Sequence, residues 1–278
     1  MKRAVLLPGL WLGPSLALLA GLPSPAIAAQ QSPEPQAAPA PATPVPSVQL
    51  LAVPTGPTAM VPEPCTPTRT GGYDWGNLCR YQKADRQVAP PVRAVFLGDS
   101  ITEWWLTTAP ALFAGGGLID RGIAGQTSPQ ILLRFYQDVV RLHPRVVHIM
   151  CGTNDVAGNT GPTSPDEYAA NILAMVDLAR ANGISVVLGS VLPSGGFNWR
   201  AGMKPAAQIA ALNVWLKDLA RTRGLVYADY YSAMATPEGA MKPGLSGDGV
   251  HPNAAGYAIM EPIARAALAE AEAQSAAR

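Results

Sequence analysis

The stretch RAVFLGDSIT, residues 93–102, holds the pattern on which the fold depends: a short apolar run, a glycine, and then polar residues. A continuous apolar run of this length is typical of a strand buried on both faces. The segment TEWWLTTAPALF that follows is weakly helical, and Pro110 would bend or end such a helix. We therefore expect a β-α unit with Ser100 at the turn between its strand and its helix.

The same alternation continues toward the C-terminus. Four further runs are strand-like: GLIDRGIAG, RVVHIMCG, ISVVLGSVLP and LVYADYY. Between and after them lie segments with helical spacing: SPQILLRFYQDVVRLH, SPDEYAANILAMVDLARANG, KPAAQIAALNVWLKDLARTRG and NAAGYAIMEPIARAALAEAEA. Apolar strands separated by amphipathic helices predict a parallel sheet of about five strands with helices on both faces, an α/β fold.

Composition and charge exclude several classes of protein. Of the 278 residues 48% are hydrophobic, which is enough for a sizeable core, and only 14% are charged. The formal net charge is +1 and no run of lysine or arginine occurs, so we expect no nucleic-acid partner. The composition does not determine an oligomeric state.

The first residues resemble a secretory signal peptide. Lys2 and Arg3 precede an apolar run over residues 4–22, and small residues follow up to a cleavage site near Ala28. A membrane anchor is the alternative, but two prolines and a glycine interrupt the run, which is short of the roughly 20 residues of a span. We expect residues 1–28 to be removed, leaving an exported protein, periplasmic or extracellular, without a stable membrane span.

The next segment differs in composition from the rest of the chain. Residues 29–70 are rich in proline and alanine and show no sustained apolar periodicity. Such a segment cannot bury enough surface to offset its chain entropy, so we expect a disordered, extended linker. The folded domain is then expected over residues 71–278, with its core at 93–268.

The three cysteines differ in their surroundings. Export permits a disulfide, and Cys65 and Cys79 lie close together at the start of the domain, so they are the expected pair. Cys151 lies in the apolar run VVHIMCG and is expected to be a buried, unreactive thiol.

Polar and small residues follow the predicted strands, where parallel sheets bind ligands. They are Gly98, Asp99 and Ser100 after the first strand, Gly122 and Gly125 after the second, Asn154 and Asp155 after the third, and Asp248 and His251 in GDGVHPN beyond the fifth. Because the carboxyl ends of parallel strands share one edge of the sheet, these groups are expected to converge there.

A hydrolytic site accounts for most of these residues. The Ser100 hydroxyl is a weak nucleophile that needs a base, which His251 can supply, and Asp248 can accept the other ring N–H and fix the tautomer. The backbone amides of Ser100 and Gly125 and the side-chain amide of Asn154 are available as donors to an oxyanion.

Two acidic residues are expected to have supporting roles. Asp99 is expected to stabilise its turn, and Asp155 is expected to hold the loop that aims Asn154. The alternative for the glycine-aspartate-serine turn is structural, because such a turn alone is more often the start of a helix. Trp104 and Trp105 could line an acyl pocket, although at least one of them is expected to be ordinary core.

Two other classes of protein remain possible at this point. A metal-dependent phosphoesterase could use the same acidic residues, with Asn154 and His251, as ligands, although the set is poor in histidine. A non-catalytic polysaccharide- or surface-binding module would suit the proline-rich tether.

The motifs FLGDSIT, RGIAGQTS, GTND and DGVHPN occur in the order and approximate spacing of the four blocks of the SGNH hydrolases, also called the GDSL esterase/lipase family. The sequence is similar, over residues 93–268, to small single-domain members such as lysophospholipase L1 and the platelet-activating-factor acetylhydrolase subunits. Ile101 replaces the leucine of the family name, which is a common variation.

The resemblance implies a flavodoxin-like three-layer α/β/α sandwich. It also implies Ser100 as the nucleophile, Asp248 and His251 as the rest of a triad, and Gly125 and Asn154 as oxyanion donors, with no metal or organic cofactor. We therefore expect a serine esterase that cleaves short-chain acyl esters, acetyl among them, of carbohydrates or lipids through an acyl-enzyme. A small-molecule or polysaccharide ester is the expected partner, and short acyl groups are favoured because no long lid-like apolar insertion is visible.

Overall fold

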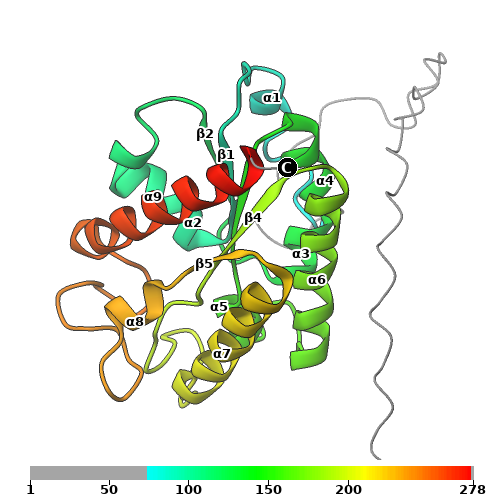
Figure 1. Ribbon diagram of the computed structural model, residues 1–278. Helices are drawn as coiled ribbons and strands as arrows, with labels where there is room; N and C mark the ends of the chain where they lie inside the picture. Colours follow the sequence, from blue (N-terminus) through cyan, green and yellow to red (C-terminus); the bar gives the residue numbers. More distant parts are fainter. Residues whose placement is uncertain (1–73, 277–278) are drawn as a thin grey trace, which may run out of the picture. The chain divides into compact units, whose positions relative to one another are not determined.

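The computed structural model describes residues 74–276 (Figure 1). The expected signal peptide, the expected linker and Cys65 lie outside the described residues, so the cleavage site, the linker and the pairing of Cys65 with Cys79 stay predictions. Cys151 is a free thiol and is buried, and burial raises its pKa well above the usual value. Within residues 74–276, none of the helices has both the length and the apolarity needed to span a bilayer.

Five parallel strands form one sheet in the order β2-β1-β3-β4-β5. Their bounds are β1 Ala94–Gly98, β2 Leu118–Gly122, β3 Val146–Met150, β4 Ser185–Gly189 and β5 Val226–Ala228. The expectation of a parallel sheet of about five strands is confirmed. The strand order is the flavodoxin-like one, and the chain reverses its direction of progress beside β1, which is where ligands bind in such sheets.

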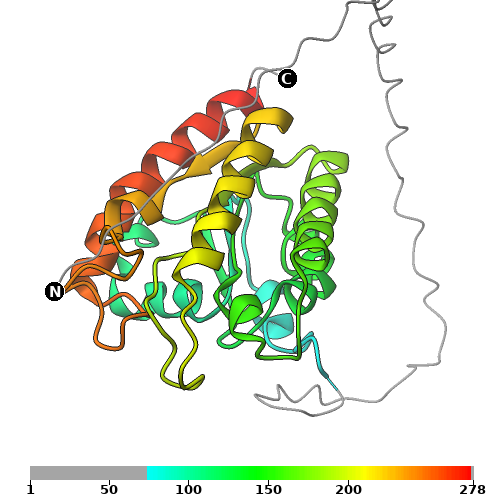
Figure 2. The ribbon, with the colours of Figure 1, turned by 90° about the horizontal axis from the view of Figure 1, so that it is seen from below.

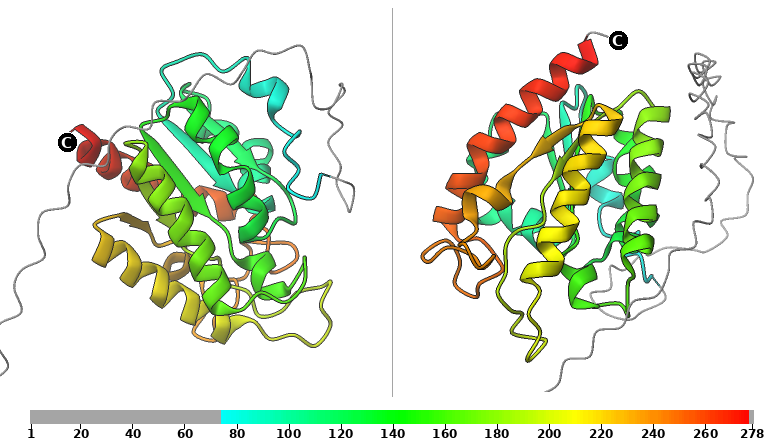
Figure 3. Two further views of the ribbon diagram at one scale, coloured as in Figure 1. Left: turned by 90° about the vertical axis from the view of Figure 1, so that its right-hand side faces the viewer. Right: turned by 60° about the horizontal axis from the view of Figure 1, so that its bottom comes forward.

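Helices cover both faces of the sheet, as expected. The longer ones are α2 Ser100–Thr108, α6 Pro165–Ala181, α7 Ala206–Arg223 and α9 Ala254–Ala276. The short ones are α1 Gln82–Asp85, α3 Ser128–Leu133, α4 Phe135–Asp138, α5 Thr153–Ala157 and α8 Tyr230–Met234, with 3-10 turns at η1 Pro110–Leu112 and η2 Val140–Leu142. Figures 2 and 3 show α9 on one side of the sheet and α6 and α7 on the other.

Alternating side chains of strand β1 belong to two separate cores. Val95 and Leu97 pack with residues of α3, α4, α6 and α7, whereas Ala94 and Phe96 pack with residues of α2, α8 and α9. This alternation explains why the strand is apolar at every position, because both of its faces are covered.

Two glycines let α2 lie directly against the strand ends. A Cβ on Gly98 would lie 2.1 Å from Thr102 Oγ1, and one on Gly122 would lie 2.1 Å from Glu103 N. Either distance is far below van der Waals contact, so any larger residue would displace the helix. The helix itself ends at Thr108, two residues before Pro110.

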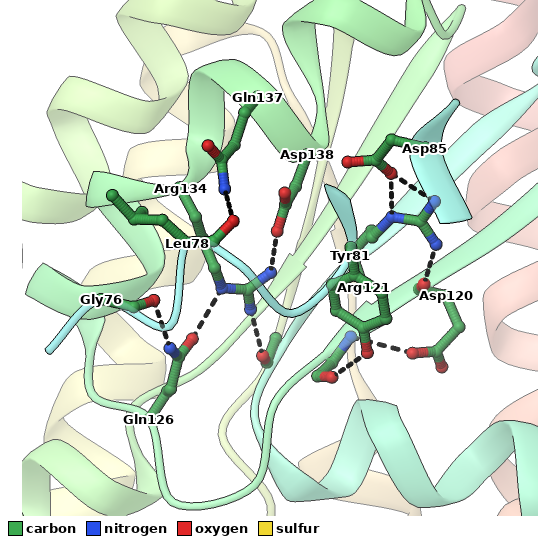
Figure 4. Close-up of polar contacts among 12 residues, drawn as sticks. Gly76, Leu78, Tyr81, Asp85, Asp120, Arg121, Gln126, Arg134, Gln137 and Asp138 are labelled. Carbon is green, nitrogen blue, oxygen red and sulfur yellow. Dashed lines mark hydrogen bonds and ion pairs between the residues drawn. The ribbon is translucent and has the colours of Figure 1, made fainter. Parts of the chain in front are cut away.

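The segment just before the sheet, residues 74–85, is held by polar side chains (Figure 4). The Gln126 and Gln137 side-chain amides donate to the carbonyl oxygens of Gly76 and Leu78 at 2.9 and 2.6 Å. The fully buried Arg134 joins this layer to the end of β1. Its guanidinium donates to Gln126 Oε1 at 2.6 Å, to Asp138 Oδ2 at 2.9 Å and to the Gly98 carbonyl at 2.8 Å.

Candidate active site

The carboxyl ends of the central strands bring the expected residues together. Gly98 of β1 is in register with Gly122 of β2 and with Met150 of β3, so the segments that follow these strands leave the sheet at one edge. Ser100 begins α2, and Asn154 lies in the first turn of α5. The loop between α8 and α9 supplies Asp248 and His251.

A continuous hydrogen-bonded chain connects three of these side chains. Ser100 Oγ lies 3.0 Å from His251 Nε2, and His251 Nδ1 lies 2.6 Å from Asp248 Oδ2. The second oxygen of Asp248 accepts hydrogen bonds from the backbone amides of Val250 and His251 at 2.9 and 2.8 Å, and from the Ser246 hydroxyl at 2.9 Å. These contacts hold the carboxylate in place, so the ring that it touches has a defined orientation.

The charge state of Asp248 follows from these contacts. Burial alone would raise its pKa, but the hydrogen bonds from the His251 ring and from the backbone amides outweigh burial and lower the pKa to about 2. The carboxylate is therefore ionised at neutral pH and can accept a hydrogen bond from the Nδ1–H of His251, which leaves Nε2 as the ring nitrogen that faces Ser100.

Asp99 holds the turn that presents Ser100. Its Oδ1 accepts a hydrogen bond from the Ile101 amide at 3.0 Å, which caps α2, and its Oδ2 lies 3.3 Å from Asn154 Nδ2. Asp99 is buried, and burial raises its pKa to about 6 despite the hydrogen bond from Ile101 and the field of His251.

Asp155 contacts Ser128 at the start of α3. Both of its carboxylate oxygens lie 3.0 Å from the Ser128 amide nitrogen, and the Ser128 hydroxyl donates to Oδ1 at 2.5 Å. Burial raises the pKa of Asp155, although the hydrogen bonds from Ser128 oppose the shift. The contact ties α5, which carries Asn154, to α3.

Gly125 and Asn154 lie on segments that contact α2 or the turn before it. Gly125 has φ +81°, a conformation that favours glycine, although open space surrounds the position of a Cβ. The amide of its neighbour Ala124 donates to Glu103 Oε2 at 2.8 Å, which anchors this loop to α2. The Asn154 side-chain amide donates to the Gln126 carbonyl at 3.0 Å.

Two tryptophan rings lie close to the His251 ring. The Trp104 ring centroid lies 4.3 Å from that of His251, and the Trp199 centroid lies 6.3 Å from it. Both indoles are exposed, at 38% and 41%. Trp105, in contrast, is fully buried and stacks on Tyr257, so of the two adjacent tryptophans only Trp104 reaches the site.

Sequence reasoning did not single out Trp199 or its partner Asn159. The indole N–H of Trp199 donates to Asn159 Oδ1 at 2.9 Å, and the Asn159 amide donates to Asn154 Oδ1 at 2.6 Å. The position of Trp199 is a signal in the sequence, because residues 190–205 follow β4 at the same edge of the sheet as the other site residues.

The other histidines lie apart from this cluster. His148 is buried in β3, where its Nε2 lies 2.8 Å from the Tyr230 hydroxyl, and burial lowers its pKa to about 3. His143 is exposed next to Pro144. Among residues 74–276, no three or more His, Cys, Asp or Glu side chains are grouped as they would be to hold a metal ion.

The strand order and the helices on both faces of the sheet are those of the SGNH hydrolase fold. Residues 96–259 match the model of the GDSL-like lipase/acylhydrolase family. The chain therefore belongs to the GDSL-like lipase/acylhydrolase family, and by class it is an ester hydrolase.

Solved structures agree with this assignment. A candidate acylhydrolase from Bacteroides fragilis is 42% identical, with a TM-score of 0.70, over 72% of this chain and 100% of its own. A GDSL-like lipase from Bacteroides thetaiotaomicron is also 42% identical, with a TM-score of 0.68, over 70% and 98% of the two chains. The acetylxylan esterase Axe2 from Geobacillus stearothermophilus shares the fold at 20% identity, with a TM-score of 0.53, over 65% and 95%.

Among curated proteins, an uncharacterized lipoprotein from Bacillus subtilis, YqeF, is 33% identical over 79 residues. The match covers 27% of this chain and 32% of that protein, so this chain spans about a third of the length of that relative.

Proposed function

We propose that this protein is an exported serine esterase that hydrolyses short-chain acyl esters of carbohydrates or lipids through an acyl-enzyme. The observation that carries the proposal is the unbroken chain from Ser100 Oγ through the His251 ring to the Asp248 carboxylate. Nucleophile, base and orienting acid are within hydrogen-bond reach of one another, which is the geometry that acyl transfer requires.

The proposed reaction has two halves. His251 Nε2 takes the proton of Ser100 while Oγ bonds to the acyl carbon, and the imidazolium then protonates the leaving alcohol as the ester C–O bond breaks. In the second half His251 deprotonates a water, which attacks the acyl-enzyme and releases the acid and free Ser100. Asp248 stabilises the imidazolium in both halves.

The tetrahedral intermediates need donors already in place. The backbone amides of Ser100 and Gly125 and the side-chain amide of Asn154 supply them in this proposal. The Asn154 amide has two acceptors in the free site, and the contact with Asp99 Oδ2 at 3.3 Å is the longer of the two. The oxyanion is expected to take over the hydrogen on that side, because the longer contact costs less to replace.

Features at the mouth of the site support an ester substrate whose alcohol part is a carbohydrate or a lipid. Trp104 and Trp199 present flat, exposed rings close to His251, which suits the C–H faces of sugar rings as well as short aliphatic groups. A cavity of about 380 Å³ lies beside Asp248, lined in part by Phe197 and Arg200. In this proposal the cavity holds a distal part of the alcohol, because Asp248 lines it but His251 and Ser100 do not.

The proposed export rests on the N-terminal sequence pattern of residues 1–28, which lie outside the described residues. The similarity to a Bacillus subtilis lipoprotein is consistent with a protein that leaves the cytoplasm. Fractionation of cells that express the full chain, with N-terminal sequencing of the mature protein, tests export and cleavage near Ala28.

The central experiment compares p-nitrophenyl acetate, butyrate and octanoate, and acetylated xylo-oligosaccharides, as substrates of the wild type and of Ser100→Ala. We expect the wild type to prefer the short esters and Ser100→Ala to be inactive on all of them. Ser232→Ala, a serine of α8 outside the site, serves as the matched control. Full activity in Ser100→Ala would overturn the proposal, and a preference for octanoate would overturn its short-chain part.

A further inference from the structure

A directional chain of side-chain hydrogen bonds runs from the mouth of the site to Asn154. It begins at the exposed indole of Trp199, whose N–H donates to Asn159 Oδ1 at 2.9 Å. Asn159 Nδ2 donates in turn to Asn154 Oδ1 at 2.6 Å. Asn154 is buried, so the chain connects a surface that substrate would touch to a group inside the site.

The chain has a direction because an indole N–H can only donate. Asn159 must therefore turn its oxygen toward Trp199, which leaves its NH₂ group facing Asn154. Asn154 must in turn present its oxygen to Asn159, so its own NH₂ group points to the opposite side, toward Asp99 and Gln126. The two ends of an amide have nearly the same shape, and only their partners select between the two orientations.

The direction matters for the proposed chemistry. With its NH₂ group turned toward Asp99, Asn154 offers a donor beside the Ser100 turn. With the amide reversed, a carbonyl oxygen would stand there and would repel a developing oxyanion.

We propose that Asn159 is a positioning residue for the oxyanion donor Asn154, and that Trp199 sets the orientation of both amides from the mouth of the site. The inference rests on the proposed function, in which Asn154 donates to the oxyanion.

Contacts to the backbone near these hydrogen-bonded side chains support this role. The Arg200 guanidinium donates to the Gly158 carbonyl at 2.6 Å, and the backbone N–H of Asn159 donates to the backbone carbonyl of Asn154 at 3.0 Å. The β4–α7 loop is thus tied to the end of α5 at the residues next to Trp199 and Asn159. Phe197 stacks on Trp199 with ring centroids 5.0 Å apart, which further defines the position of the indole.

Two other contacts also favour this orientation of Asn154 and limit the expected size of the effect. The Asn154 NH₂ group donates to the Gln126 carbonyl at 3.0 Å and to Asp99 Oδ2 at 3.3 Å. Removal of Asn159 leaves both of these constraints in place. We therefore expect a partial loss of turnover, smaller than that of removing Asn154 itself.

The first test compares kcat and KM of Asn159→Ala, Asn159→Asp and Asn154→Ala on p-nitrophenyl acetate. Asn159→Ala is expected to lose about tenfold in kcat with KM nearly unchanged, against about 10²–10³ for Asn154→Ala. Asn159→Asp is expected to lose more than Asn159→Ala, because a carboxylate cannot donate to Asn154 Oδ1 and favours the reversed amide. Asn182→Ala, at the C-terminal cap of α6, is the matched control.

A double substitution separates positioning from general support of the fold. In an Asn154→Ala background, Asn159→Ala should change kcat by less than about twofold, because the group that it positions is gone. A loss that multiplies with that of Asn154→Ala would overturn the proposal, as would wild-type kcat in Asn159→Ala.

The second test isolates the indole N–H. Trp199→Phe keeps an aromatic ring but removes the donor, and it is expected to lower kcat by roughly two- to tenfold, the usual range for one hydrogen bond, with little change in KM. Trp199→Ala should also raise KM. Trp75→Phe, at another exposed tryptophan, is the control. An effect of Trp199→Phe on kcat that persists in the Asn159→Ala background would overturn the role given to Trp199.

These results are distinguishable from a failure of the proposed function. That failure would appear as an active Ser100→Ala protein, whatever the Asn159 variants do. If Ser100→Ala is inactive and Asn154→Ala is impaired, the proposed function holds. The kcat values of the Asn159 and Trp199 variants then test the positioning role by itself.

Discussion

Ser100 Oγ and His251 Nε2 lie 3.0 Å apart, although 151 positions separate the two residues in the chain. One residue begins a helix directly after the first strand of the sheet, and the other lies on the loop before the last helix. The contact is reinforced from α9, where the Tyr257 hydroxyl donates to the Ile101 carbonyl at 2.7 Å, next to Ser100. The packing of the C-terminal helix on α2 thus helps to bring Ser100 and His251 together.

Asp248→Asn is expected to abolish most of the activity without unfolding the protein. An asparagine can keep its oxygen on the amides of Val250 and His251, but its NH₂ group would then donate to His251 Nδ1 and move the ring proton to Nε2. That tautomer cannot accept the proton of Ser100, so kcat should fall by about 10³–10⁴. Steady-state kinetics check this result, with His251→Ala as the reference for a site without its base. Wild-type kcat in Asp248→Asn would contradict the orienting role.

The lowered pKa of Asp248 predicts a pH dependence of a definite sign. Its pKa of about 2 lies below the usual value of 3.8. The ionised carboxylate therefore stabilises the folded state at any pH above 3.8, and this contribution is lost as the pH falls from 3.8 toward 2. We expect the free energy of unfolding of Asp248→Asn to fall less steeply than that of the wild type as the pH decreases over this range. Denaturant titrations at a series of pH values measure this difference. The same pH dependence in both proteins would exclude this contribution.

Asn154→Ala should reduce turnover by about 10²–10³, which is the usual effect of removing one oxyanion donor. KM should change little, because the donor acts on charge that develops in the transition state. The control is the melting temperature, since Asn154 also holds the Gln126 carbonyl. A rise in KM at constant kcat would show instead that Asn154 binds the ground state.

Asp120→Asn should change how stability depends on pH. Asp120 is buried, its Oδ1 accepts from the Gly122 amide at 2.8 Å, and its Oδ2 has no hydrogen-bond partner in the described part of the chain. Burial raises its pKa to about 7, against the pull of the Gly122 amide and Arg121. A raised carboxylate pKa stabilises the fold at low pH, and this contribution is lost as the pH rises from about 4 through 7.

The wild type is therefore expected to lose stability between pH 5 and pH 8 to a greater extent than Asp120→Asn does. Melting temperatures across this range measure the difference, since 1 kcal/mol corresponds to about 2–4 °C in a domain of this size. Asp99, whose pKa is raised to about 6, contributes in the same direction in both proteins. Parallel pH profiles would contradict the prediction.

Gly122→Ala and Gly125→Ala are expected to fail in different ways. At Gly122 a Cβ would lie 2.1 Å from Glu103 N, so the helix must move, and we expect a loss of about 2–4 kcal/mol in the free energy of unfolding. At Gly125 there is space, but φ is +81°, and alanine there costs about 1–2 kcal/mol. Denaturant unfolding should rank the two variants in this order. Gly125→Ala should lose proportionally more kcat, because the strain falls on a proposed oxyanion donor.

Chelation distinguishes the esterase from a metal-dependent phosphoesterase. The proposed mechanism uses only groups of this chain, so prolonged treatment with EDTA followed by dialysis should leave the hydrolysis of p-nitrophenyl acetate unchanged. A loss of activity that zinc or manganese restores would favour the phosphoesterase, as would hydrolysis of a phosphodiester by Ser100→Ala.

Much of the fold was accessible to sequence reasoning because the signals are local. Apolar runs and helical periodicity indicate strands and helices, and alternation of the two indicates a parallel sheet. The residues after the strands could be grouped as one site because parallel strands end at a common edge. The neighbours Trp104 and Trp105 could not be told apart, since which of them faces His251 depends on how α2 rotates against β1 and α9.

The sequence by itself therefore determined the element order, the sheet type and the polar residues that follow four of the five strands, because these follow from short-range periodicity and from motifs in a fixed order. Only the tertiary structure decided which of those groups touch. The α8–α9 loop lacks a regular pattern, and its approach to Ser100 depends on the docking of α9. The link from Trp199 through Asn159 to Asn154 joins two loops whose proximity depends on the packing of β3 against β4. Contacts of this kind arise between segments far apart in the chain, so no local pattern encodes them.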